Sequence, residues 1–403
     1  MRGRAADRPS LWTPAFILVV AATALLFLGF YAALPALPLF GRALGAATGE
    51  VGWVITAFSL AALATRVVAA RHLDGPRRRP LLLIGLALYS AAAAALPWCA
   101  TWGQLLGVRV LHGVGWGLTT TAIGALVADL APASRRGEAI GSWGLAPTAA
   151  MGIGPLLGET IAAWGGFAAV FGATAVGGVL AALAIAPVRV GWPRSKARHA
   201  AEATQDSSLL PRGAGLPALA LFLSSLAYGA LVAFLPLETA AVPGRAGVFF
   251  TVYALAVLSA RPLAGRLSDR VGRRPLIVPG LIVGGIGTVL LGVAPAGAAL
   301  IAAALLIGAG IGGASFPTLM ALIVDRTSAQ RRGATMGAYF TAYDLAIALG
   351  AALSGPVYAA SGFAALNAVA ALGIVAAVPV TLVCRSRLDE KPTVAAGLRD
   401  RME

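Results

Sequence analysis

Long apolar stretches contain titratable side chains that could bind or release a proton, among them Asp344, Glu159, Arg109 and His112. Asp344 comes about ten residues after the start of the stretch 334–359, a depth of about 15 Å if that stretch crosses a membrane as a helix. Desolvation there favours the protonated carboxyl group, whereas a wet cavity or a cationic substrate favours the ionised form. A residue that couples transport to protons needs this balance. A buried structural hydrogen bond is the alternative role for Asp344.

Arg109 and His112 are three residues apart, so a helix places them on one face. An arginine in hydrocarbon costs about 3 kcal/mol or more without a partner or a cavity. Histidine titrates near neutral pH, and both residues are therefore candidates for proton coupling, together with Glu159. The alternatives are a structural arginine bonded to carbonyls, a packed histidine and an interfacial glutamate. Tyr339 and Tyr343, five and one residues before Asp344, are candidate substrate contacts, although neither spacing places a tyrosine squarely on the face of Asp344.

The elements that position these residues are apolar spans. The chain has 403 residues, of which 59% are hydrophobic and 12% are charged. About 20 apolar residues cross the hydrocarbon core as a helix, and twelve stretches are long enough. They are 14–39, 51–70, 81–100, 103–127, 139–161, 167–188, 216–237, 247–263, 276–293, 298–324, 334–359 and 363–383.

The net charge of +15 reflects membrane topology. All but five of the 31 Lys and Arg fall at the termini or in every second connection between spans; the five are Arg42, Arg66, Arg109, Arg245 and Arg261. The positive-inside rule then predicts a multi-pass protein of the cell membrane with both termini in the cytoplasm. Nucleic-acid binding is not expected. Cys99 and Cys384 have no second Cys or His at ligand spacing, so no metal or cofactor is expected either.

The sequence repeats itself at an offset of about 195 residues. At this offset, Arg66, Asp74 and Arg78 correspond to Arg261, Asp269 and Arg273. Further along the chain the offset increases by one residue, and there Asp129 corresponds to Asp325. Six spans per copy is an even number, so the copies are parallel and enclose a central cavity. We predict an N-terminal six-helix bundle over 1–188, a cytoplasmic linker over 189–215, and a C-terminal six-helix bundle with a short tail over 216–403.

The segment Gly265-Arg266-Leu267-Ser268-Asp269-Arg270-Val271-Gly272-Arg273-Arg274 follows the eighth span as a loop. It resembles the signature G-x-L-x-D-R-x-G-R-R of the major facilitator superfamily, and the segment around Asp74 and Arg78 is a degraded copy. A carboxylate flanked by guanidinium groups can hold neighbouring helix ends and their acids, Asp129 or Asp325, and release them in another state. The alternative is a solvated anchoring cluster. Arg66 and Arg261 are assigned to the same cytoplasmic gate.

Two further spans carry the resemblance. Arg109 and Gly113 are similar to the family's R-x-x-x-G pattern in the fourth helix, and Gly154-Pro155 with Gly158 resembles the motif that the family's antiporters carry in the fifth. Small residues let helices approach closely and proline bends them, which suits a hinge and a seal. Ordinary glycine-rich packing is the alternative. The resemblance to antiporters implies export.

The sequence therefore predicts an all-α membrane protein of twelve helices in two parallel six-helix repeats. The expected function is proton-coupled export of a small amphipathic or drug-like molecule by alternating access. The expected partners are that substrate, protons and the lipid bilayer, and we expect a monomer. A proton-coupled importer of a nutrient uses the same fold and is the first alternative. A membrane-embedded enzyme or lipid-handling protein is the second, but His72, His112 and His199 are scattered and no catalytic cluster is visible, so no enzymatic activity is expected.

Overall fold

A computed structural model describes the chain over residues 10–70, 78–132, 135–188, 215–326 and 332–384. Every regular element in these ranges is helical. The elements are α1 Pro14–Ala43, η1 Thr48–Glu50, α2 Trp53–Ala70, α3 Arg78–Ala95, η2 Leu96–Trp98, α4 Trp102–Leu130, α5 Arg136–Ile185, α7 Gly215–Glu238, α8 Arg245–Val271, α9 Arg274–Val293, α10 Gly297–Ile307, η4 Gly308–Ser315, α11 Phe316–Asp325 and α12 Arg332–Val383.

Ten helices in the described ranges are long and apolar enough to cross a membrane, and α10, η4 and α11 together form one of them. Two of the ten, in α5 and α12, are 48 and 49 residues long, about twice the length of a single crossing. Each contains one glycine with a left-handed backbone, Gly166 at φ 64° and Gly362 at φ 76°. Counting each as two spans gives twelve crossings, in agreement with the sequence.

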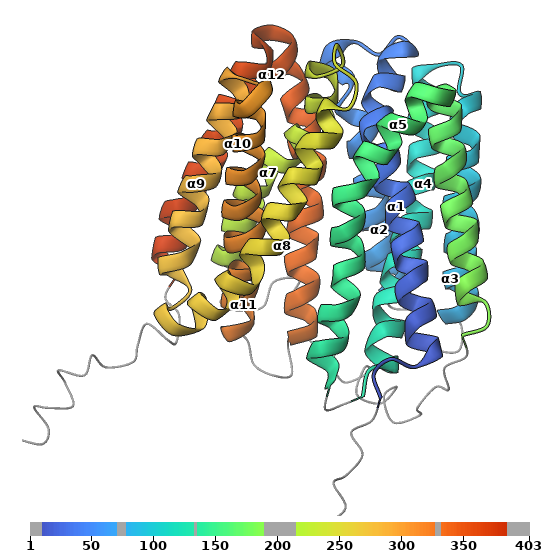
Figure 1. Ribbon diagram of the computed structural model, residues 1–403, viewed down its shortest axis with the longest axis horizontal. Coiled ribbons are helices and arrows are strands. Elements are labelled where there is room, and N and C mark those ends of the chain that lie inside the picture. Colours follow the sequence, from blue (N-terminus) through green and yellow to red (C-terminus); the bar gives the residue numbers. More distant parts are fainter. Residues whose placement is uncertain (1–9, 71–77, 133–134, 189–214, 327–331, 385–403) are drawn as a thin grey trace, which may run out of the picture. The chain divides into compact units, whose positions relative to one another are not determined.

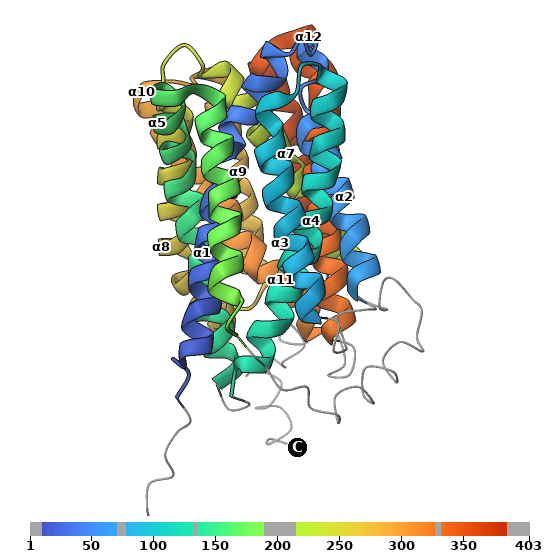
Figure 2. The same cartoon turned by 90° about the vertical axis from the view of Figure 1, so that its right-hand side faces the viewer.

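The chain separates into two compact units, one of Met1–Glu202 with Val232–Thr251 and one of Ala203–Leu231 with Val252–Glu403. In the first unit, α1 packs along α5, and α4 packs against both α2 and α3 (Figures 1 and 2). In the second unit, α9 packs against α10 and α12. Each unit has its own apolar core, centred on residues such as Leu86 and Ile123 in the first and Leu281 and Leu322 in the second.

Glycines set the close approach of the helices in both units, and the contacts recur 195 residues apart. A Cβ on Gly113 of α4 would lie 2.3 Å from the carbonyl oxygen of Phe58 on α2. A Cβ on Gly308 would lie 2.6 Å from the carbonyl oxygen of Tyr253 on α8. The pairs Gly115 with Tyr89 and Gly310 with Gly284 repeat in the same way, with distances of 2.4 and 2.7 Å to the backbone nitrogen. The repeat seen in the sequence is therefore also a repeat of helix contacts.

The expectation that residues after 263 form a loop is wrong. Helix α8 continues to Val271, so most of the charged signature lies on the helix and not beyond it. The residue after the helix is Gly272, whose φ of 96° is a conformation that glycine adopts without strain. Charged residues such as Asp269 and Arg270 are exposed on this extension, so the helix can continue past its apolar part.

A Cβ added at a repeated glycine contact should push the helices apart. We expect Gly113→Ala and Gly308→Ala each to destabilise the protein by about 1–3 kcal/mol, because the atoms they meet are backbone and cannot rotate away. Thermal unfolding in detergent measures the effect. Gly124→Ala is the matched control, since nothing lies within 4 Å of a Cβ there. An equal loss in all three variants would contradict the packing argument.

Candidate functional site

Arg109 and His112 form a buried polar pair inside the first unit, on the shared face that their spacing predicts. Arg109 is only 1% exposed, and its Nη1 donates a hydrogen bond to Nδ1 of His112 at 2.8 Å. Its Nε donates to the carbonyl oxygen of Val54 at 3.0 Å, and the guanidinium carbon lies 4.1 Å from the ring centre of Phe58. Neutral groups thus surround this cation in the contacts seen here.

The pairing fixes the state of the histidine ring. A guanidinium group has only donors, so Nδ1 of His112 must accept and the ring proton must sit on Nε2. That Nε2 and the hydroxyl of Tyr89, whose ring centre is 4.4 Å from that of His112, are buried and have no hydrogen-bond partner among the described residues. His112 therefore stays neutral while Arg109 contacts it. Protonation of His112 requires that this contact break.

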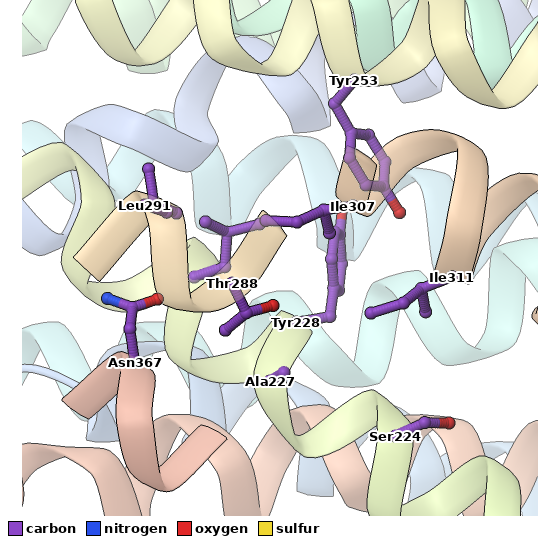
Figure 3. Close-up of a pocket in the computed structure, with 10 residues that line it drawn as sticks. Ser224, Ala227, Tyr228, Tyr253, Thr288, Leu291, Ile307, Ile311 and Asn367 are labelled. Carbon is purple, nitrogen blue, oxygen red and sulfur yellow. The ribbon is translucent and has the colours of Figure 1, made fainter. Parts of the chain in front are cut away.

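The equivalent region of the second unit is a small pocket (Figure 3). The sequence offset places Ala304 and Ile307 where the first unit has Arg109 and His112. Ile307 lines the pocket together with residues from α7, α8, α9 and α12. Its polar lining residues are Ser224, Thr288 and Asn367, and each donates to a carbonyl of its own helix at 2.9 Å. These three donors are thereby satisfied, and the pocket presents mainly apolar surface and the aromatic rings of Tyr228 and Tyr253.

A row of aromatic rings connects this pocket to the segment that carries Asp344. The ring of Tyr228 lies 6.1 Å from that of Tyr253 and 6.4 Å from that of Tyr343, and the ring of Tyr343 lies 5.0 Å from that of Phe316. Asp344, the next residue on α12, is half-buried. Asp344 thus belongs to the second unit, whereas Arg109 and His112 belong to the first.

Tyr339 occupies a different environment from Tyr343. Its side chain is fully buried, and its hydroxyl donates to the carbonyl oxygen of Phe316 at 2.6 Å. That hydrogen bond ties α12 to the start of α11. Of the two tyrosines expected near a substrate, Tyr343 is the one with a partly exposed side chain.

The antiporter-like stretch of α5 packs tightly on α1. A Cβ on Gly154 would lie 2.5 Å from the Cβ of Tyr31, and a Cβ on Gly158 would lie 1.9 Å from the carbonyl oxygen of Ala32. Pro155 lies between them inside the helix. Only glycine allows the two backbones this close. The next residue, Glu159, points elsewhere: it accepts a hydrogen bond from the backbone N–H of Gly247 on α8 at 3.0 Å.

The charged signature of the second repeat forms a compact cluster. Arg273 donates to Asp269 at 2.6 Å, to Ser268 at 2.7 Å and to Asp325, at the end of α11, at 2.9 Å. Partial burial alone would lower the pKa of Arg273, but hydrogen bonds and attraction from Asp325 and Asp269 raise it on balance. The arginine therefore stays charged and holds the ends of α8, α9 and α11 together. Arg270 is exposed at the same helix end, two residues before Gly272, and Gly265 lies one turn before Asp269.

The first repeat shows less of its cluster. Asp74 lies outside the described residues, and Arg78 is described only as the first residue of α3. Asp129 lies in the last turn of α4. The two arginines assigned to the gate differ: Arg66 donates to the hydroxyl of Thr120 at 3.4 Å, whereas Arg261 donates to the carbonyl oxygen of Gly312 at 3.3 Å. Gly312 belongs to η4, a π-helical segment.

The sequence interpretation missed the aromatic neighbours of these groups. Phe58 packs on Arg109, and Tyr253 lines the pocket of the second unit. A signal was present, because these two residues are 195 apart and are both aromatic. Trp116, one turn after His112 on α4, stacks on Phe30 with ring centres 4.3 Å apart and was not singled out either.

The geometry defines a class of protein: a multi-pass helical membrane protein built from two repeats, with buried ionisable groups in its spans and charged clusters at helix ends. The sequence model of the Major Facilitator Superfamily matches residues 19–239 and 217–400 of this chain. The chain therefore belongs to that superfamily.

Individual relatives are consistent with this assignment. A transporter of this superfamily from Mycobacterium tuberculosis is 36% identical over 111 residues, which cover 28% of this chain and 19% of that protein. The chloramphenicol resistance protein of Pseudomonas aeruginosa is 26% identical over 66% of this chain and 65% of that protein. Multidrug resistance protein 2 of Bacillus subtilis is 27% identical over 37% of this chain and 38% of that protein. The matches thus span less than two thirds of these relatives.

Solved structures share the fold. The human organic anion transporter MFSD10 superposes with a TM-score of 0.66 at 20% identity, over 93% of this chain and 100% of that one. A D-xylose–proton symporter superposes with a TM-score of 0.71 at 18% identity, over 92% and 99%. These likenesses concern architecture. The chain thus shares both the family and the architecture of membrane-embedded transporters.

The buried pair in α4 makes a testable contribution to stability. We expect His112→Leu to destabilise the protein by about 1–3 kcal/mol, because a guanidinium N–H of Arg109 would lose its acceptor in a dry interior. His112→Gln, which can present an amide oxygen, should lose less. Thermal unfolding of the purified protein measures both. Equal losses in the two variants would show that the hydrogen bond contributes nothing beyond the packing of the ring.

The helix-end cluster gives a second test. Asp325 is 31% exposed and Asp269 is 68% exposed in their ion pairs with Arg273. We therefore expect Asp325→Asn to destabilise the protein by about 1–3 kcal/mol and Asp269→Asn by less than about 1 kcal/mol. Unfolding curves at low and high salt measure this, and salt should reduce only the smaller effect. The reverse ranking would contradict the role given to Asp325.

Proposed function

We propose that this chain exports a small amphipathic, drug-like molecule in exchange for protons, by alternating access of a central site to the two sides of the membrane. The single observation that carries the proposal is the packing of the antiporter-like stretch, in which Gly154 and Gly158 bring α5 directly onto α1. Such a seal limits proton leakage while the substrate site faces one side. It favours an exchanger over a passive pathway.

Two observations support an amphipathic substrate. Relatives bear the names chloramphenicol resistance protein, multidrug resistance protein 2 and, in Staphylococcus aureus, quinolone resistance protein NorA. In this chain, Tyr343 belongs to a row of aromatic rings beside a half-buried carboxylate, Asp344. Aromatic rings offer a flat apolar surface, and a carboxylate attracts a cationic group.

We propose Asp344 as the group that alternates between a proton and the substrate. Arg109, His112 and Glu159 assist in coupling. The hydrogen bond of Arg109 to His112 supports a two-state role: one state holds His112 neutral, and the other frees it to take a proton. The state of one ring is thus tied to a movement of the neighbouring guanidinium group.

The charged clusters serve as the cytoplasmic gate in this proposal. The halves 1–188 and 216–403, joined by the linker 189–215, alternate as two bodies, and the cluster around Arg273 holds one of the two states. Asp74, Arg78 and Asp129 do the same in the first repeat, with Arg66 and Arg261. These halves differ from the two compact units, in which residues 232–251 group with the first part of the chain.

We propose the cell membrane as the location, with both termini in the cytoplasm, and a monomer as the working form.

An importer and a membrane enzyme are the competing functions. The fold serves import equally well, and the direction of substrate flux relative to proton flux distinguishes the two. The members of the superfamily are transporters, and we propose that the chain has no enzymatic activity.

Transport in proteoliposomes with an imposed pH gradient tests the proposal, with a panel of cationic and neutral drugs as substrates. We expect drug and proton flux in opposite directions, and a loss of at least about fivefold in gradient-driven flux for Asp344→Asn. Asp344→Glu, which keeps a carboxylate, is the matched control and should retain coupling. Full coupled flux in Asp344→Asn would remove Asp344 from the mechanism, and flux in the same direction as protons would favour import.

A further inference from the structure

The first turn of α8 lacks a cap from its own segment. The helix begins at Arg245, and the carbonyl oxygen of Gly244 accepts its first hydrogen bond, from Val248 at 2.9 Å. Gly244 is therefore the N-cap residue, with φ of 85° and no side chain. An N-cap side chain normally accepts a hydrogen bond from the second or third N–H of the helix. Here the third is the N–H of Gly247.

Glu159 supplies that missing acceptor from another helix. Its carboxylate accepts from the N–H of Gly247 at 3.0 Å, and the backbone of Gly244 is a second hydrogen-bond partner. Both belong to the same compact unit, because residues 232–251 group with the first part of the chain. A carboxylate at a helix N-terminus is favoured both by these donors and by the helix dipole.

The surrounding contacts fit this arrangement. A Cβ on Gly247 would lie 2.6 Å from the Cα of Leu156 and 2.9 Å from the Glu159 carboxylate, so only glycine lets α5 come this near. One turn further along α8, the hydroxyl of Thr251 donates to the carbonyl oxygen of Gly152. Gly152, Leu156 and Glu159 are spaced four and three residues apart on one face of α5. Gly154 and Gly158 pack against α1.

The arrangement is particular to one half of the chain. Glu159 corresponds to Gly355 in the second repeat, which has no side chain to play this part. The segment before α2, which corresponds to the start of α8, is held locally: Glu50 accepts from the N–H of Ala47 at 3.0 Å. Arg245 stands at the position that corresponds to Glu50. The local carboxylate is thus absent before α8, and a carboxylate from α5 takes its place.

We infer that Glu159 is a proton-binding cap of α8: ionised, it holds the first turn of α8 against α5, and protonated, it releases that turn. A neutral carboxyl group keeps a weaker hydrogen bond and loses its attraction to the helix dipole. The step adds one proton to the carboxylate and breaks no covalent bond. This inference deepens the proposed function, because it assigns one of the assisting acids to a movable contact.

The charged residues that flank this helix start along the chain are Arg245, in the first turn of α8, and Glu238, at the end of α7. Tyr31 on α1 is the titratable side chain at the opposite face of α5.

Hydrogen–deuterium exchange of the peptide covering residues 244–251 tests the inference, in the full chain and without substrate. Rates are corrected for the intrinsic effect of pH. In the native protein, protection of this peptide should fall roughly tenfold as Glu159 takes up a proton between pH 9 and pH 4. Glu159→Gln should show the low protection at every pH, and Glu159→Ala should show still less.

Glu50→Gln is the matched control, since it removes a capping carboxylate of the other repeat and should leave residues 244–251 unchanged. Native-like protection in Glu159→Gln at high pH, or a native protein without pH dependence, would overturn the inference. The pH series on the native protein needs no variant, and it therefore decides the question even if Glu159→Gln fails to fold. The readout is independent of transport, so a failure of the proposed function in proteoliposomes is distinguishable from a failure of the cap.

Discussion

The structure depends on how closely its helices approach one another. In a membrane, lipid chains are as apolar as the side chains they replace, so helices gain little from hiding apolar surface and associate mainly through packing. Gly113 and Gly308 each bring a neighbouring carbonyl oxygen to within 2.3 and 2.6 Å of where a Cβ would be. The polar groups of the site depend on this geometry, because Arg109 reaches the carbonyl of Val54 only when α2 lies directly against α4.

The two repeats use the same helix contacts for different interiors. The first fills its interior with Arg109, His112 and Trp116, which pack among aromatic rings. The second has Ile307 and Ile311 at the positions that correspond to His112 and Trp116, and a small pocket forms there. Duplication thus supplied one scaffold twice, and substitution made one copy polar and filled and the other apolar and partly open. Asp344 belongs to the second copy, the one that contains the pocket.

Much of the fold could be predicted from the sequence, because hydrocarbon imposes a length on every span and a helical backbone within it. The same is true of the pairing of Arg109 with His112, which depends only on helix periodicity. The partner of Glu159 could not be predicted, because Gly247 is 88 residues away and periodicity does not state which helices are neighbours. The hydrogen bond of Tyr339 to Phe316 and the extension of α8 to Val271 were missed for related reasons: each depends on tertiary contacts or on polar residues beyond the apolar span.

The π-helical winding of Gly308–Ser315 accounts for a shift in the register of the repeat. The offset between copies is 195 residues at Gly117 and Gly312 but 196 at Asp129 and Asp325, so the second copy carries a single-residue insertion between these points. A wider turn absorbs one additional residue, whereas in an uninterrupted α-helix the insertion would rotate everything after it by about 100°. Asp325 would then face away from Arg273. The underwound π-helical segment thus preserves the ion pair of Arg273 with Asp325 despite the insertion, and it lies in a stretch so rich in glycine that the wider winding meets little steric resistance.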